Sequence, residues 1–133
     1  MVYDLETIVE GIETLATTAP PDSGMKLIRS AKLMSGSEFF DVRATTDRTQ
    51  IATMVLQNGQ VSGEFGTDHP DADQTFYVLE GTGQLVLESG DTELRVGDVG
   101  VIVAGTKHQF MGKSERAFRT LNVYTPVAYP DEA

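Results

Sequence analysis

Short strand-like runs, each closed by a turn, dominate the sequence from residue 25 onward. Turn-forming combinations of Asn, Gly, Asp and Ser lie at 58–59, 81–83, 89–91 and 97–98. Such combinations supply the backbone conformations that tight turns need. Many short strands at near-regular spacing favour an antiparallel sandwich or barrel over alternating strands and helices. We therefore predict an all-β domain, with strands over 26–34, 39–45, 50–56, 61–69, 74–79, 84–88, 92–96, 99–103, 107–111 and 117–124.

One helical pattern precedes this series. Leu5, Ile8, Ile12 and Leu15 follow one another at spacings of three, four and three, with glutamates between them. This spacing places the apolar side chains on one face of a short amphipathic helix. The following segment, 17–24, contains two consecutive prolines and an Asp-Ser-Gly turn, which end a helix. We predict a helix and connector over 1–24 and a β-barrel domain over 25–133.

Composition excludes several classes of protein. The chain has 133 residues, 40% of them hydrophobic, which fits one domain with one core. It has no cysteine, so disulfides and thiolate metal sites are excluded. Its net charge of −10, from 20 acidic and 10 basic residues, disfavours binding to nucleic acid. No apolar stretch approaches the ~20 residues that span a bilayer, and no basic-then-apolar leader begins the chain, so we expect a cytoplasmic protein.

The two histidines of the chain, His69 and His108, lie at expected strand ends beside turns. Side chains alternate faces along a strand, so Phe65, Thr67 and His69 are expected on one face. The Pro-Asp-Ala-Asp turn at 70–73 can reset this phase and bring Gln74 beside His69.

In that register, Phe76 and Val78 face the interior together with Gln74. His108 enters through the turn at 104–106, and Phe110 follows it in phase. Three polar side chains, His69, Gln74 and His108, can therefore meet at one end of an apolar barrel. Its expected wall is formed by Phe65, Phe76, Val78 and Phe110. The plainer alternative is that each histidine is a hydrogen-bonded core residue.

These segments resemble the two sequence motifs of the cupin superfamily. The first motif reads Gly, five residues, His-x-His, three or four residues, Glu, six residues, Gly. Here Gly63 opens the segment two positions too close, Thr67 stands at the first histidine position and His69 at the second. Gln74 replaces the acidic ligand, and Gly81 and Gly83 close the motif.

The second motif reads Gly, five residues, Pro-x-Gly, two residues, His, three residues, Asn. Gly97, Gly105 and His108 match it, whereas Val103 replaces the proline and Gly112 the asparagine. The resemblance spans about residues 48 to 126. It implies a double-stranded β-helix, or jelly-roll, barrel that binds a divalent metal ion.

The altered positions change the chemistry that the resemblance implies. Two neutral imidazoles and one amide oxygen would hold the ion, with Thr67 a weak ligand or a partner of a bound water. Such a set leaves the metal charge uncompensated, binds more weakly than three histidines and a glutamate, and attracts a small anionic molecule. Zinc, nickel, copper, iron and manganese all stay open.

Two functions stay open. One is a metal-dependent oxygenase, isomerase or decarboxylase. The other is a barrel that binds or senses a small molecule or a metal without catalysis. The resemblance also implies a homodimer, since small single-domain cupins are commonly dimeric. No spacing in the sequence singles out a catalytic residue.

Overall fold

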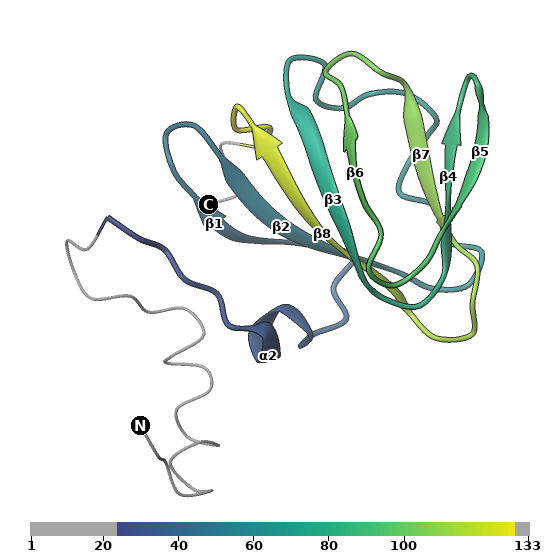
Figure 1. The fold of residues 1–133 in the computed structure, drawn as a ribbon, viewed down its shortest axis with the longest axis horizontal. Coiled ribbons are helices and arrows are strands. Elements are labelled where there is room, and N and C mark those ends of the chain that lie inside the picture. Colours follow the sequence, from purple (N-terminus) through teal and green to yellow (C-terminus); the bar gives the residue numbers. More distant parts are fainter. Residues whose placement is uncertain (1–23, 130–133) are drawn as a thin grey trace, which may run out of the picture. The chain divides into compact units, whose positions relative to one another are not determined.

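The computed structural model describes residues 24–129. The chain divides into two compact units, and all of the strands lie in the second, which begins at Ser37. Five strands form one sheet in the order β1-β2-β8-β3-β6 (Figure 1). Three form a second sheet in the order β5-β4-β7. Within each sheet, every pair of neighbouring strands is antiparallel. The strands are β1 (Phe40–Thr45), β2 (Gln50–Leu56), β3 (Asp73–Glu80), β4 (Gly83–Leu87), β5 (Gly90–Leu94), β6 (Val99–Ile102), β7 (His108–Gly112) and β8 (Phe118–Thr125).

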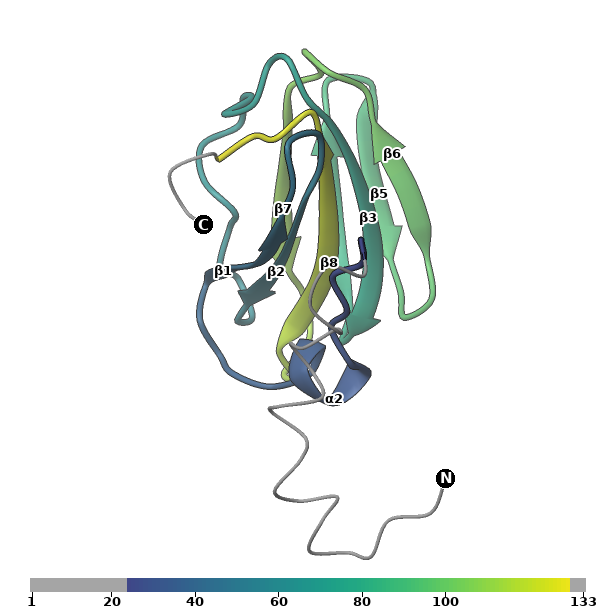
Figure 2. The ribbon, with the colours of Figure 1, turned by 90° about the vertical axis from the view of Figure 1, so that its left-hand side faces the viewer.

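The core of this unit lies between the two sheets, which Figure 2 shows from the side of β1 and β2. In β3, Gln74, Phe76 and Val78 are buried in alternation with more exposed neighbours, as a strand with one covered face requires. The larger sheet contributes Met54, Leu56, Phe76, Val78, Ile102 and Phe118 to the core, and the smaller sheet contributes Leu85, Leu94 and Phe110. At Gly100, a β-carbon would lie 2.6 Å from the Phe76 ring, so close packing explains that glycine.

Residues 57–72 depart from the prediction. The expected strand over 61–69 is wrong, because this segment makes only isolated bridges, Val61 with Met111 and Gly66 with His108. Gly63, at a φ of 146°, breaks the extended run. The segment nevertheless runs along β7: the Gly66 amide donates to the His108 carbonyl at 3.3 Å, and the His108 amide donates to the Gly66 carbonyl at 3.0 Å.

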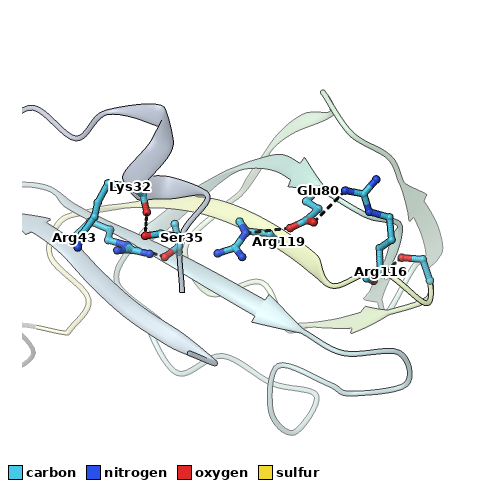
Figure 3. Close-up of polar contacts among 8 residues, drawn as sticks. Lys32, Ser35, Arg43, Glu80, Arg116 and Arg119 are labelled. Carbon is cyan, nitrogen blue, oxygen red and sulfur yellow. Dashed lines mark hydrogen bonds and ion pairs between the residues drawn. The ribbon is translucent and has the colours of Figure 1, made fainter. Parts of the chain in front are cut away.

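The strand expected over 26–34 is also wrong. Residues Ser30–Leu33 form a single helical turn, α2, whose Met34 amide donates to the Ser30 carbonyl at 2.9 Å. The Ser35 hydroxyl donates to the Lys32 carbonyl at 2.7 Å (Figure 3). The Ser-Ala-Lys-Leu sequence contains good helix formers and no β-branched residue, which explains the turn. The helix predicted between residues 5 and 16 lies outside the described residues.

Buried charge at the far end of β3 is paired. Glu80 lies between two arginines, 3.3 Å from the Arg119 Nε and 3.3 Å from an Arg116 Nη (Figure 3). The Arg119 side chain is buried, so the Glu80 carboxylate supplies the counter-charge that it needs. Between residues 24 and 129, no helix combines the length and the apolar character that crossing a bilayer requires.

Candidate metal centre

A cavity of about 330 Å³ opens into the barrel unit, and three of its lining side chains are the predicted ligands. His69 comes from the 57–72 segment, Gln74 from the start of β3 and His108 from the start of β7. All three are buried. The imidazole ring centres of His69 and His108 are 5.2 Å apart. The structure thus brings together side chains that are up to 39 positions apart in the sequence.

A tight turn accounts for the shared location of His69 and Gln74. The Ala72 amide donates to the His69 carbonyl at 3.0 Å, which closes the turn predicted after His69. At the end of that turn, the Asp73 carboxylate accepts a hydrogen bond from the Ala104 amide at 2.8 Å. This contact ties the turn before β3 to the loop that leads to His108.

Both histidines are held through the same ring nitrogen. The His108 Nδ1 lies 2.8 Å from the Thr106 carbonyl, and the His69 Nδ1 lies 3.3 Å from the Ala72 carbonyl. A carbonyl can only accept, so each neutral ring carries its proton on Nδ1 and keeps a lone pair on Nε2. Histidines that bind metals commonly have their second nitrogen fixed in this way.

Gln74 presents an acceptor that has no partner. Its Nε2 donates to the Asn122 Oδ1 at 2.9 Å, and the Asn122 Nδ2 donates to the Thr120 Oγ1 at 3.0 Å. The Asn122 Nδ2 also donates to the Thr120 backbone carbonyl at 3.4 Å, and a carbonyl can only accept, so this contact fixes the Asn122 amide and with it the orientation of the Gln74 amide. The Gln74 Oε1 is then buried without a hydrogen-bond partner among the described residues. A buried unsatisfied acceptor costs about 1–3 kcal/mol, so this oxygen is suited to a bound cation or donor.

The two imidazole rings are spaced as they would be around one divalent metal ion. Metal–imidazole nitrogen distances are about 2.0–2.1 Å, so two ring centres around a tetrahedral ion would be about 5.2 Å apart. The observed separation of His69 and His108 is 5.2 Å. With the Gln74 oxygen they would make a set of three uncharged donors. Within residues 24–129, no cluster of three His, Cys, Asp or Glu side chains exists that could hold an ion. The third ligand of this site would therefore be the amide oxygen of Gln74, not a carboxylate or a third histidine.

Burial lowers the pKa of His108 below its ordinary value of 6.5. The nearby His69 lowers this pKa further, whereas the hydrogen bond with the Thr106 carbonyl and the charge of Asp68 act in the opposite direction. A lowered pKa favours the neutral imidazole, which is the form that binds a metal ion.

Two tyrosines that the sequence reasoning did not assign to the site also line the cavity. The Tyr124 ring lies 5.0 Å from that of His69, and the Tyr129 ring lies 5.3 Å from that of Tyr124. Burial raises the pKa of Tyr124 well above 10, with contributions from Tyr129 and Asp68. Burial likewise raises the pKa of Tyr129. Both hydroxyls therefore stay protonated and can act as hydrogen-bond donors.

The expected wall needs correction. Phe110 lines the cavity, whereas Phe76 and Val78 are buried in the core and do not line it. Phe65 is 40% exposed and lies outside the lining, because alternation of faces fails in a segment that is not a strand. Thr67 does not line the cavity either, and its buried hydroxyl has no hydrogen-bond partner among residues 24–129. The apolar lining comes instead from Phe39, Phe40, Met54 and Phe110.

The family model for the cupin domain matches residues 52–124, which is more than half of the chain. The chain belongs to the cupin family. This confirms the predicted double-stranded β-helix fold. Of the side chains that line the cavity, those of Phe39, Phe40 and Tyr129 lie outside the matched range.

Several solved structures resemble this chain in fold at low sequence identity. The crystal structure of BH2720 from Bacillus halodurans is 22% identical, covers 84% of this chain and 89% of its own, and has a TM-score of 0.72. A sugar phosphate isomerase of the cupin superfamily from Silicibacter pomeroyi is 26% identical, with coverages of 60% and 52% and a TM-score of 0.54. A predicted oxalate decarboxylase from Thermotoga maritima is 22% identical, with coverages of 61% and 69% and a TM-score of 0.54. No curated protein matches the chain.

Proposed function

We propose that this cupin binds one divalent metal ion through His69, Gln74 and His108, and a small anionic molecule beside it. The observation that carries the proposal is the buried, unpartnered Oε1 of Gln74, a residue that lines the same cavity as both histidines. A solitary buried acceptor destabilises the protein without an ion. A bound ion would satisfy it.

The charges of the ion and of the cavity lining favour a ligand with a single negative charge. Three neutral protein ligands leave the double positive charge of the ion uncompensated, which favours an anion in the remaining coordination positions. The lining contains Glu64 and Asp68 but no lysine or arginine. These two carboxylates repel further negative charge. A monocarboxylate therefore suits the site better than a dianion or a phosphate ester.

Two structural neighbours are named for the conversion of small, oxygen-rich anions, a sugar phosphate and oxalate.

The chemistry open to such a site is isomerisation, decarboxylation or oxygenation. A bound divalent ion supplies Lewis acidity to a coordinated oxygen. Tyr124 and Tyr129 contribute neutral hydroxyls, and the apolar side chains of Phe40, Met54 and Phe110 limit the access of water. The uncharged ligand set equally suits a protein that binds or senses its ligand without turning it over.

We also propose that the chain forms a homodimer. Strand β6 is an edge of the five-stranded sheet, and on and just beyond it Val99, Val101 and Val103 are 64%, 59% and 64% exposed. A row of exposed β-branched side chains on a sheet edge is a common site of strand pairing between chains. Packing of this face against the same face of a second chain would cover the row.

Elemental analysis of protein purified without an affinity tag, followed by ligand titration, tests the proposed function. We expect close to one divalent ion per chain, and acetate or glycolate binding that depends on the metal. Metal-free protein that binds these anions as tightly as metal-loaded protein would contradict the proposal. So would a protein that neither retains nor takes up an ion.

A further inference from the structure

The chain after β8 is tied back to the beginning of β2. The Gln50 Nε2 donates to the Tyr129 carbonyl at 2.8 Å, and the Tyr129 amide donates to the Gln50 Oε1 at 2.9 Å. Gln50 is fully buried, and its Nε2 also donates to the Thr45 Oγ1 at 3.2 Å. The Gln50 side-chain amide therefore pairs with both the amide and the carbonyl of Tyr129, as the backbone of a neighbouring strand would. The described chain after β8 turns toward β1 and β2 in Figures 1 and 2.

This attachment places the Tyr129 side chain in the wall of the candidate metal centre. Its ring lies edge-on to Phe40 at 5.0 Å and to Tyr124 at 5.3 Å, and 6.4 Å from the His69 ring. Edge-on contacts with three rings restrict the orientation of the Tyr129 ring. The backbone and the ring are thus both fixed, although the residue follows the last strand.

The hydroxyl of Tyr129 has a proton to donate. A hydrogen bond between the two tyrosines raises the pKa of Tyr124 and counteracts the rise in the pKa of Tyr129. Burial raises the pKa of Tyr129, so its hydroxyl keeps a proton that it can donate to an acceptor in the cavity that Tyr129 lines.

We propose that Tyr129 is a specificity-determining residue, which donates a hydrogen bond to a carboxylate or carbonyl oxygen of the ligand. The inference rests on the proposed function, because it assumes that another ligand oxygen lies at the metal ion. It assigns a role to a residue outside the matched cupin domain, supplied by a segment that Gln50 anchors. The ligand class is then a small monocarboxylate with two oxygen acceptors, such as a hydroxy acid or a keto acid.

Calorimetric titration of cobalt-loaded protein tests this assignment. Wild type is compared with Tyr129→Phe, which keeps the ring, and with Tyr77→Phe, which changes an exposed tyrosine of β3. The probes are acetate, glycolate and pyruvate. Imidazole is the control probe, because it binds a metal through one nitrogen and has no oxygen acceptor. A hydrogen bond to a charged group corresponds to about a tenfold change or more in affinity.

We expect Tyr129→Phe to weaken binding of the tightest carboxylate at least about tenfold, with imidazole and cobalt affinities unchanged and Tyr77→Phe equal to wild type. Gln50→Met, which releases the anchored segment, should also weaken carboxylate binding. An unchanged carboxylate affinity in Tyr129→Phe would overturn the inference while leaving the proposed function intact. Equal losses for imidazole and the carboxylate, or no carboxylate binding to the cobalt-loaded wild type, would also overturn it. Failure of wild type to bind cobalt would instead overturn the proposed function.

Discussion

Replacing Gln74 with methionine separates the metal-site role of this side chain from a structural one. Methionine nearly conserves the volume but removes both polar atoms of the amide. The change eliminates the unpartnered Oε1, a gain of about 1–3 kcal/mol, and leaves the Asn122 Oδ1 without its donor, a similar cost. The two effects offset each other. We therefore expect the metal-free variant to match the wild-type unfolding free energy within about 1 kcal/mol.

Gln50→Met is the matched control. Gln50 is also a buried glutamine, but its amide makes three hydrogen bonds, two with the Tyr129 backbone and one with Thr45. Losing them should cost about 2–3 kcal/mol, at roughly 1 kcal/mol each. Urea denaturation of the metal-free proteins measures both variants. A Gln74→Met variant destabilised as much as Gln50→Met would show that the Gln74 amide is structural, and the argument from its unpartnered oxygen would fail.

The remaining predictions concern charge, pH and assembly. Gln74→Glu should tighten metal binding at least about tenfold by adding a negative charge, as calorimetry can show, and an unchanged affinity would mean that position 74 does not contact the ion. Metal-free protein should lose stability as pH falls below about 6.5. The lowered folded pKa of His108 means that the unfolded state binds more protons down to that pKa. Urea denaturation at pH 7.5 and 5.5 should show this loss in wild type and a smaller one in His108→Gln, and equal losses would contradict it. Sedimentation should give twice the 14.4 kDa chain mass for wild type and the single mass for Val101→Lys, whereas a monomeric wild type at micromolar concentration would refute the dimer.

Local sequence patterns correctly predicted eight of the ten expected strands and indicated that three polar side chains line one cavity. Alternating burial in β3 follows directly from its sequence, and the turn at 70–73 was sufficient to place Gln74 in the same cavity as His69. Turn chemistry and period-two alternation are short-range effects, so a single sequence reveals them.

Long-range contacts account for what was missed. Tyr129 follows the last strand in a segment without periodicity, and it reaches the cavity through Gln50, 79 positions away. A pattern of apolar residues could not reveal that pairing. A glutamine at the first position of a buried strand is nevertheless unusual, and its amide needs hydrogen-bond partners when it is buried. Phe65 was misplaced because Gly63 and Gly66 prevent the continuous strand that the alternation assumed.

Calorimetric titration of metal-free, tag-free protein with zinc and cobalt tests the central claim most directly. We expect one saturable site per chain in wild type, and loss of most of that binding in His69→Ala and in His108→Ala, because each variant keeps a single imidazole ligand. The absorption spectrum of the bound cobalt should show nitrogen and oxygen ligands in wild type. Metal binding in both alanine variants at the wild-type affinity would contradict the account, because the ion would then lie elsewhere.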